Sequence, residues 1–111
     1  MAIEMYEGED KVLSFTIYDS NKQLKDLTNA TAIFVMSKME INSNTITDTI
    51  TKTTSSGINI GENTVNVIID RNADVLRKGT WNYELRVTDK NSISEVVSIG
   101  SIVIKRSITN M

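Results

Sequence analysis

Apolar and polar residues alternate with a period of two in several runs spread along this 111-residue chain, and this pattern constrains the fold more than any other feature. Successive side chains of an extended strand point to opposite faces, so alternation is typical of strands with one buried and one exposed face. Ile, Val and Thr are frequent in these runs, and β-branched residues favour a pleated, half-buried surface. The runs are residues 13–17, 30–36, 45–51, 65–69, 80–88 and 97–104.

Polar clusters between the runs predict turns. Residues 19–22 (DSNK) and 89–92 (DKNS) predict two turns of the same kind. Segments 42–44, 55–57 and 61–63 predict three more. The chain has no Pro, so these turns depend on Gly, Asn, Asp, Ser and Lys.

The last run is interrupted by Gly100, and a glycine inside a strand is typical of a β-bulge. A bulge shifts the side-chain register by one residue. We therefore expect the apolar residues on both sides of the glycine to share the core-facing side, and these are Val97, Ile99, Ile102 and Ile104.

Seven to eight short strands, with turn signals about every ten residues, predict an all-β fold, specifically an immunoglobulin-like antiparallel β-sandwich. A small closed barrel is the alternative. One short helical connector is expected at residues 72–78, with Asn72 as its cap and Gly79 ending it in the left-handed conformation. We find no linker and no internal repeat, so residues 1–111 are expected to form a single domain.

Two absences from the composition narrow the classes of function. Without Cys, the chain has no disulfide, zinc–thiolate site or cysteine nucleophile. Without His, it lacks the usual general base and the commonest metal ligand. It also contains neither a Gly-x-Ser-x-Gly motif nor a glycine-rich phosphate loop. We therefore expect no catalysis, no cofactor and no metal.

Charge and hydropathy weigh against two further classes of partner. The net charge is −2, and Lys and Arg are scattered rather than gathered in the basic stripe typical of nucleic-acid binders. The longest uninterrupted apolar run, residues 32–36, is far shorter than the roughly 20 residues that span a bilayer. Residues 1–10 lack the basic and apolar regions of a signal peptide. We expect no nucleic acid, no membrane, and synthesis in the cytoplasm.

Residues 70–74 (DRNAD) have the spacing that begins a calcium-binding loop. That loop needs Gly at its sixth position and Glu at its twelfth, where this chain has Val75 and Trp81. A strand end passing into a capped turn is therefore favoured over a metal site. Trp81 alternates with Tyr83 and Leu85, which predicts a place in the core.

Acidic residues also crowd the N-terminal segment, at Glu4, Glu7, Glu9 and Asp10. Paired carboxylates can act as acid and base when burial separates their pKa values. Here the segment is polar and offers no partner base. We expect it to be solvated or to face a binding partner.

Two of the predicted strands are apolar on both faces. In residues 30–36, Ile33 and Val35 lie opposite the main apolar face, and in the last strand Val96 and Val103 do the same. The outer face of a two-layer sandwich normally meets water. Two interpretations remain open: either a loop or the N-terminal segment covers these residues, or they form an exposed apolar strip that docks against another subunit.

Several of these motifs together resemble the N-terminal domain of the baseplate upper protein family, from bacteriophages that infect Gram-positive bacteria. The resemblance covers about residues 6–105. It rests on YEGED (6–10) before the first alternating strand, DLTNA (26–30) before the second, GINI (57–60), and GTWNYEL (79–85). The family's pattern has Gly where this chain has Asn29, a substitution that a left-handed turn position tolerates.

The resemblance implies a non-catalytic structural protein of a phage or phage-tail-like particle, made in the host bacterial cytoplasm and located in the virion. Its partners would be other virion structural proteins, bound in multiple symmetric copies, with a baseplate or tail position favoured. The residues predicted to bind a partner are Ile33, Val35, Tyr6, Glu7 and Glu9.

Two alternative functions are considered beside this interpretation. One is an immunoglobulin-like protein that decorates the capsid. The other is a module that binds host surfaces or glycans, for which exposed aromatic residues are needed. Tyr6 and Tyr18 are the candidates for that role.

Overall fold

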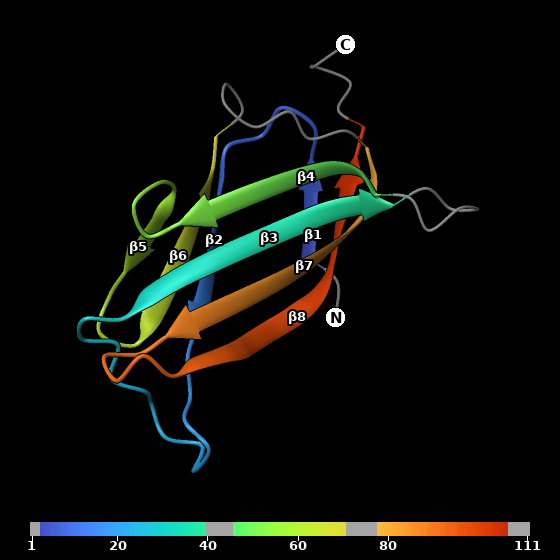
Figure 1. Ribbon diagram of the computed structural model, residues 1–111. Coiled ribbons are helices and arrows are strands. Elements are labelled where there is room, and N and C mark those ends of the chain that lie inside the picture. Colours follow the sequence, from blue (N-terminus) through green and yellow to red (C-terminus); the bar gives the residue numbers. More distant parts are fainter. Residues whose placement is uncertain (1–2, 40–45, 71–77, 107–111) are drawn as a thin grey trace.

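A computed structural model describes residues 3–39, 46–70 and 78–106 of the chain (Figure 1). Within these residues the fold is all-β, as predicted from the alternation. Its strands are β1 (Ile3–Tyr6), β2 (Lys11–Thr16), β3 (Thr31–Met39), β4 (Ile46–Thr53), β5 (Ile58–Ile60), β6 (Thr64–Ile69), β7 (Gly79–Thr88) and β8 (Ser94–Lys105).

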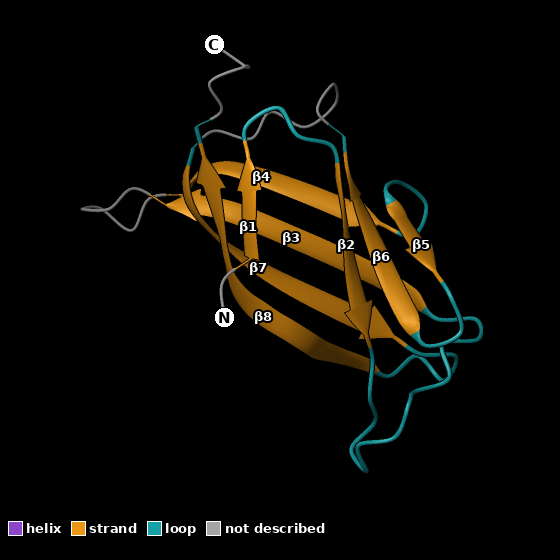
Figure 2. Cartoon of the chain, turned by 180° about the vertical axis from the view of Figure 1, so that it is seen from behind, coloured by secondary structure: helices purple, strands orange, loops and turns teal. Residues whose placement is uncertain are grey.

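The strands form two sheets that face each other (Figures 1 and 2). The larger sheet has the order β1-β8-β7-β3-β4, and the smaller has the order β2-β6-β5. The chain therefore crosses between the layers repeatedly: β1 belongs to the large sheet, β2 to the small one, β3 and β4 to the large one, β5 and β6 to the small one, and β7 and β8 to the large one. Two separate sheets are present rather than one closed sheet, so the described residues do not form the barrel considered as an alternative.

The core lies between the two sheets. Trp81 of β7 and Phe34 of β3 are completely buried there, which confirms the core position predicted for Trp81. Phe15 of β2 joins Phe34 and Tyr83 in an aromatic cluster that spans the layers, with ring centroids 5.6–6.2 Å apart. The side chains that fill the rest of the core are mainly aliphatic: Met5, Leu13, Ile17, Leu27, Ala32, Met36, Ile58, Val65, Val67, Ile69, Leu85, Val87, Ile102 and Ile104.

The first strand departs from the prediction of a wholly antiparallel fold. β1 pairs in parallel with β8, with Ile3 beside Ile102 and Met5 beside Ile104. This segment was expected to be solvated or to face a binding partner. Its Met5 is instead fully buried, while Glu4 and Tyr6 face outward. The chain then crosses from the edge of the large sheet to β2 in the other layer.

The register shift in the last strand lies elsewhere than Gly100, and the predicted bulge there is wrong. Gly100 pairs in register with Tyr83, and the shift occurs where Leu85 pairs with Ser98 while Arg86 pairs with Val96. Val97 is therefore the extra residue, and it packs against the core. Ile99 consequently faces outward instead of inward.

The two DxNx turns have the same geometry, as their sequences predict. Asp19 Oδ1 accepts hydrogen bonds from the backbone N–H groups two and four residues later, and Asp89 Oδ1 does the same. The fourth residue of each turn, Lys22 or Ser92, has a φ of 63°. Asn29 likewise adopts a left-handed φ of 59°.

The short helical connector predicted at residues 72–78 falls almost wholly on residues 71–77, outside the described residues. The part of the chain that the structure describes contains no helix, and therefore none long and apolar enough to cross a membrane. Gly79, expected at the end of that helix, begins β7 with a φ of 136°.

Candidate functional site

The outer side of the large sheet carries a group of side chains that the core does not use. In one row across the sheet, Val35 of β3 pairs with Glu84 of β7, which pairs with Ile99 of β8. In the next row, Ile33 pairs with Arg86, which pairs with Val96. Paired residues share a face of the sheet. We call these six residues, with Thr51 and Thr53 of β4 beside them, the docking face.

The aliphatic side chains of the docking face remain accessible. Ile33 is 38% exposed, Val96 is 44% exposed and Ile99 is 71% exposed, while Val35 is half-buried. They form two apolar pairs, one on β3 and one on β8, with the charged residues of β7 between them. Exposed apolar side chains mixed with polar ones are typical of protein-binding surfaces. Ile33 and Val35 were predicted from the sequence to lie here, and their backbone positions on β3 agree with that expectation.

Sequence reasoning missed Ile99, the most exposed of the four aliphatic residues. Because a bulge was predicted at Gly100, Ile99 was expected to face the core. Counting back from Ile104 in steps of two, without a shift, would have left Ile99 on the outer side together with Val103. Glu84 and Arg86 were also not singled out, because their pairing partners on β3 and β8 are distant in sequence.

Two charged residues lie between the aliphatic ones. Glu84 Oε2 and the Arg86 Nη2 atom are 4.0 Å apart, and roughly half of each side chain is exposed. Their order along β7 places one negative and one positive charge in neighbouring rows of the docking face. A surface pair of this kind contributes little to folding, because water screens the charges.

The N-terminal residues predicted to bind a partner form a turn at one edge of the large sheet. The N–H of Glu7 donates to the carbonyl oxygen of Lys105 at 2.9 Å, and the Glu7 carboxylate accepts from the N–H of Lys78 at 3.2 Å. Glu9 accepts from the N–H of Tyr6 at 3.3 Å. The two carboxylates therefore organise this turn themselves.

The position of β1 bears on what covers the docking face. β1 pairs along the edge of β8, so it extends the sheet sideways and does not lie over Ile33 or Val35. The described N-terminal residues thus do not provide the cover that one interpretation of the sequence required. Tyr6 is exposed at this edge, and Tyr18 is exposed beside Leu24 near the DSNK turn.

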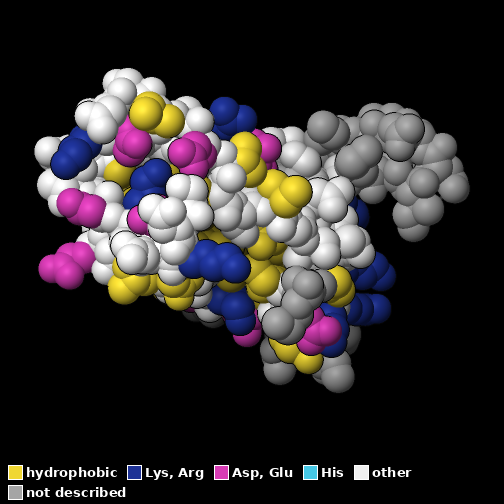
Figure 3. Space-filling view, turned by 90° about the horizontal axis from the view of Figure 1, so that it is seen from below, with side chains coloured by type: hydrophobic (Ala, Val, Ile, Leu, Met, Phe, Trp, Pro, Cys, Tyr) yellow, Lys and Arg dark blue, Asp and Glu magenta, His cyan; other side chains and the backbone are white. Residues whose placement is uncertain are grey.

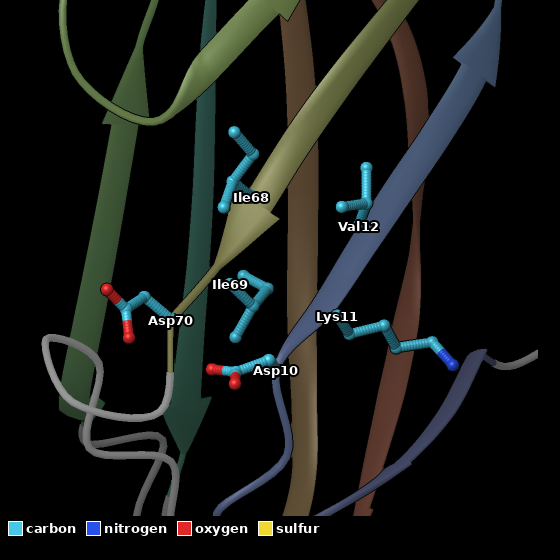
Figure 4. A pocket seen from close by; sticks show the side chains of 6 residues that line it. All are labelled: Asp10, Lys11, Val12, Ile68, Ile69 and Asp70. Atoms are coloured by element: carbon cyan, nitrogen blue, oxygen red, sulfur yellow. The ribbon is translucent and has the colours of Figure 1, made fainter.

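The hollows on the surface are open, and few of their lining side chains are suited to catalysis or metal binding. One of them, of about 400 Å³, is lined by Val12 of β2 and Ile68 of the neighbouring strand β6. Asp10 and Asp70 also line it, with their carboxylates near the ends of these strands (Figure 4). Within residues 70–74, which have the spacing that begins a calcium loop, only Asp70 lies in the described part of the chain. Throughout the described ranges, no group of three or more acidic side chains is placed to hold a metal ion.

A second hollow, of about 590 Å³, is lined by basic residues at the end of the sandwich. Its lining includes Lys38, Lys78, Lys105 and Arg106. Carboxylates already neutralise part of this charge, because Glu4 pairs with Lys105 at 3.2 Å. Basic and acidic side chains are likewise interspersed on the face seen in Figure 3, which differs from the continuous basic stripe of a nucleic-acid binder.

The two carboxyl groups whose pKa values are shifted both belong to turns. The Thr28 hydroxyl and backbone N–H donate to Asp26 and lower the pKa of its carboxyl below the ordinary value. The backbone N–H of Ile93 does most to lower the pKa of Asp89. A carboxyl group that acts as a catalytic acid or base needs a pKa raised toward neutrality. Both of these pKa values are lowered instead, as expected of carboxylates that stabilise turns.

Comparison of the chain with models of protein families, with curated proteins and with solved structures finds no match.

Proposed function

We propose that this chain is a non-catalytic structural protein of a bacteriophage or phage-tail-like particle, and that it docks on a larger assembly through an immunoglobulin-like sandwich. The observation that carries the docking role is the accessible aliphatic surface of Ile33, Val35, Val96 and Ile99 on the outer side of the large sheet. The phage context is supported by the sequence resemblance to the baseplate upper protein family.

The order of the strands supports the immunoglobulin-like part of the proposal. In variable-type immunoglobulin domains, strands G, F, C and C′ are neighbours in one sheet, and strands B, E and D belong to the other. Here β8, β7, β3 and β4 are neighbours in the large sheet, and β2, β6 and β5 form the small one. The position of the buried tryptophan differs from that in immunoglobulin domains, where it lies on strand C. Here strand C would correspond to β3, whereas Trp81 lies on β7.

Docking would use the sheet face, with the N-terminal edge adding contacts. Tyr6 is exposed beside β8, and the turn that Glu7 and Glu9 organise holds it there. Repetition of such contacts around a symmetric particle would let modest individual contacts act together. The same argument applies whether the assembly is a baseplate, a tail or a capsid surface.

The number of copies in the particle distinguishes a baseplate, tail or neck position from a capsid-decorating one. Quantitative mass spectrometry of purified particles, from the phage or prophage that encodes the chain, would compare it with the major capsid and tail-tube proteins. A few to a few dozen copies would support a baseplate, tail or neck position. A number near that of the capsid protein would make the chain a capsid-decorating subunit, and absence from the particle would contradict the proposal.

A pair of variants tests the surface. Ile33→Glu/Val35→Glu should prevent incorporation into particles while the isolated domain stays folded, because burying two added carboxylates in each docked face is unfavourable. Val12→Glu/Ile68→Glu is the matched control. Val12 and Ile68 are a cross-strand pair on the outer side of the small sheet, 56% and 37% exposed, and this variant should be incorporated normally.

Two outcomes would count against this surface: incorporation of the Ile33→Glu/Val35→Glu variant, or equal loss with both variants. A host-surface or glycan-binding role would instead give binding to bacterial glycans on an array. That binding would be lost in Tyr18→Ala and kept in Ile33→Glu/Val35→Glu.

A further inference from the structure

The charges of the docking face are arranged so that a two-fold rotation can bring each charge opposite a charge of the other sign on a second copy. Glu84 and Arg86 are successive outward residues of β7, in neighbouring rows of the sheet. Consider an axis that lies in the plane of this face, runs across the strands and passes between the two rows. Rotation about it lays a second copy face to face on the first, with Glu84 of each copy opposite Arg86 of the other.

The same rotation also matches the uncharged residues. Each side chain of one row meets the residue of the neighbouring row on the same strand. Ile33 therefore meets Val35 of the second copy, and Val96 meets Ile99. Aliphatic side chains thus oppose aliphatic ones at both flanks, while opposite charges meet between them.

The other simple axis is unfavourable. An axis parallel to β7 would place Glu84 opposite Glu84 and Arg86 opposite Arg86. Like charges brought together at a binding surface cost free energy and exclude the wrong orientation. The charge order therefore selects one of the two face-to-face arrangements.

We infer that the partner of the docking face is a second copy of this chain, bound through an isologous two-fold interface in which Glu84 of each copy pairs with Arg86 of the other. This inference rests on the proposed function only for the use of this face as a docking surface. An isologous interface requires a surface that complements itself, and the docking face meets that requirement in both its charged and its aliphatic residues.

The face is small for a specific interface, which limits the affinity to be expected. The docking face has two rows, and one further outward row lies on each side of it, with Asn82 and Thr88 as the β7 residues of these rows. Four strands about 4.8 Å apart and four such rows about 6.7 Å apart give a contact surface of roughly 500 Å² on each copy. This lies at the low end for specific interfaces. We therefore expect a dimer that dissociates in the micromolar range, and whose affinity falls as salt is raised because the charge pairs at its centre are screened.

Sedimentation velocity across a concentration series tests the inference. Wild-type protein should pass from monomer to dimer as concentration rises. Glu84→Arg and Arg86→Glu should each weaken dimerisation at least ten-fold, because each makes the face bear charge of one sign. The Glu84→Arg/Arg86→Glu variant restores the alternating order and should dimerise as the wild type does.

Mixing the two single variants provides a second test, whose expected result, a heterodimer, could not arise from misfolded protein. One variant then carries two glutamates on its face and the other two arginines, so equimolar mixing should produce a heterodimer tighter than either homodimer. A wild-type protein that stays monomeric at 1 mM would overturn the inference, as would single variants that dimerise unchanged.

These outcomes are separable from the proposed function. A monomeric wild type whose incorporation into particles still depends on Ile33 and Val35 would overturn the two-fold pairing and leave docking intact. A wild type that forms the charge-dependent dimer but is absent from particles would support the pairing and contradict the phage assignment.

Discussion

Tyr83 of β7 lies directly across from Gly100 of β8, and its ring occupies the space that a side chain at position 100 would need. A Cβ atom built on Gly100 would lie 2.9 Å from Tyr83 Cε2 and 3.0 Å from Tyr83 Oη. The Tyr83 hydroxyl lies 3.1 Å from the Ser98 hydroxyl, which fixes the ring over the glycine. Phe15 and Phe34 pack against the other parts of the ring.

Gly100→Ala should therefore destabilise the fold by roughly 1–3 kcal/mol, because the added methyl group forces the ring out of its place. Thermal or denaturant unfolding would measure the loss. Ser101→Ala is the control, since its side chain is on the other side of the sheet, and it should be nearly neutral. The cost of Gly100→Ala should shrink in a Tyr83→Leu background, and an unchanged cost there would contradict the role of the ring.

Trp81, the single tryptophan of the chain, is completely buried and should report folding directly. Its emission is expected to be blue-shifted and poorly quenched by acrylamide in the native protein, then to shift to the red on unfolding. A Trp81→Phe/Tyr18→Trp variant moves the indole to an exposed site. Its emission should be red-shifted and readily quenched, and similar quenching of the two proteins would contradict the burial of Trp81.

Asn29 holds a left-handed turn before β3, with a φ of 59°. Gly adopts this conformation freely, so Asn29→Gly should leave stability within about 0.5 kcal/mol of the wild type. Asn29→Val should cost about 1–3 kcal/mol, because a β-branched residue is strained there. Thr31→Val, two residues later in an exposed strand position, is the control and should be tolerated. Equal effects of the two valine substitutions would contradict the turn geometry.

Acid should weaken the fold partly through Asp89 and Asp26. The folded-state pKa of each is lowered, chiefly by the Ile93 N–H at Asp89 and by the Thr28 hydroxyl at Asp26. The ionised carboxylates are therefore favoured in the folded state. Their contribution is fully present above the unfolded pKa, near pH 4, and is lost as pH falls through the folded pKa.

Asp89→Asn isolates this charge effect, because the amide oxygen can still accept the two backbone hydrogen bonds of the turn. The free energy of unfolding of this variant should depend less on pH between 7 and 3 than that of the wild type. Urea unfolding at several pH values would measure the difference. Parallel pH dependences for the two proteins would contradict the prediction.

The sequence placed most strands within a few residues of their observed positions, because alternation is a local signal. The run 80–88 corresponds to β7, the run 65–69 to β6 and the run 30–36 to β3. Ile33 and Val35 were placed on the outer side of β3 by the same reasoning. A strand side chain points opposite to its neighbours whatever the strand is paired with.

The errors arose where pairing with a distant strand decides the outcome. β1 is acidic and short, and only its alignment beside β8, about a hundred residues later, buries Met5. Gly100 was interpreted as a bulge from its type alone. Its actual partner is the ring of Tyr83, and the shift lies beside Leu85 and Arg86 instead.

The sequence by itself thus determined which segments extend, which turns bend and which faces of the middle strands are apolar. Tertiary structure decided the neighbours of each strand, the side to which Ile99 points and the position of Glu84 and Arg86 between two aliphatic flanks. The physical reason is that side-chain direction within a strand follows from local backbone geometry, whereas register between strands is set by contacts between residues far apart in the chain.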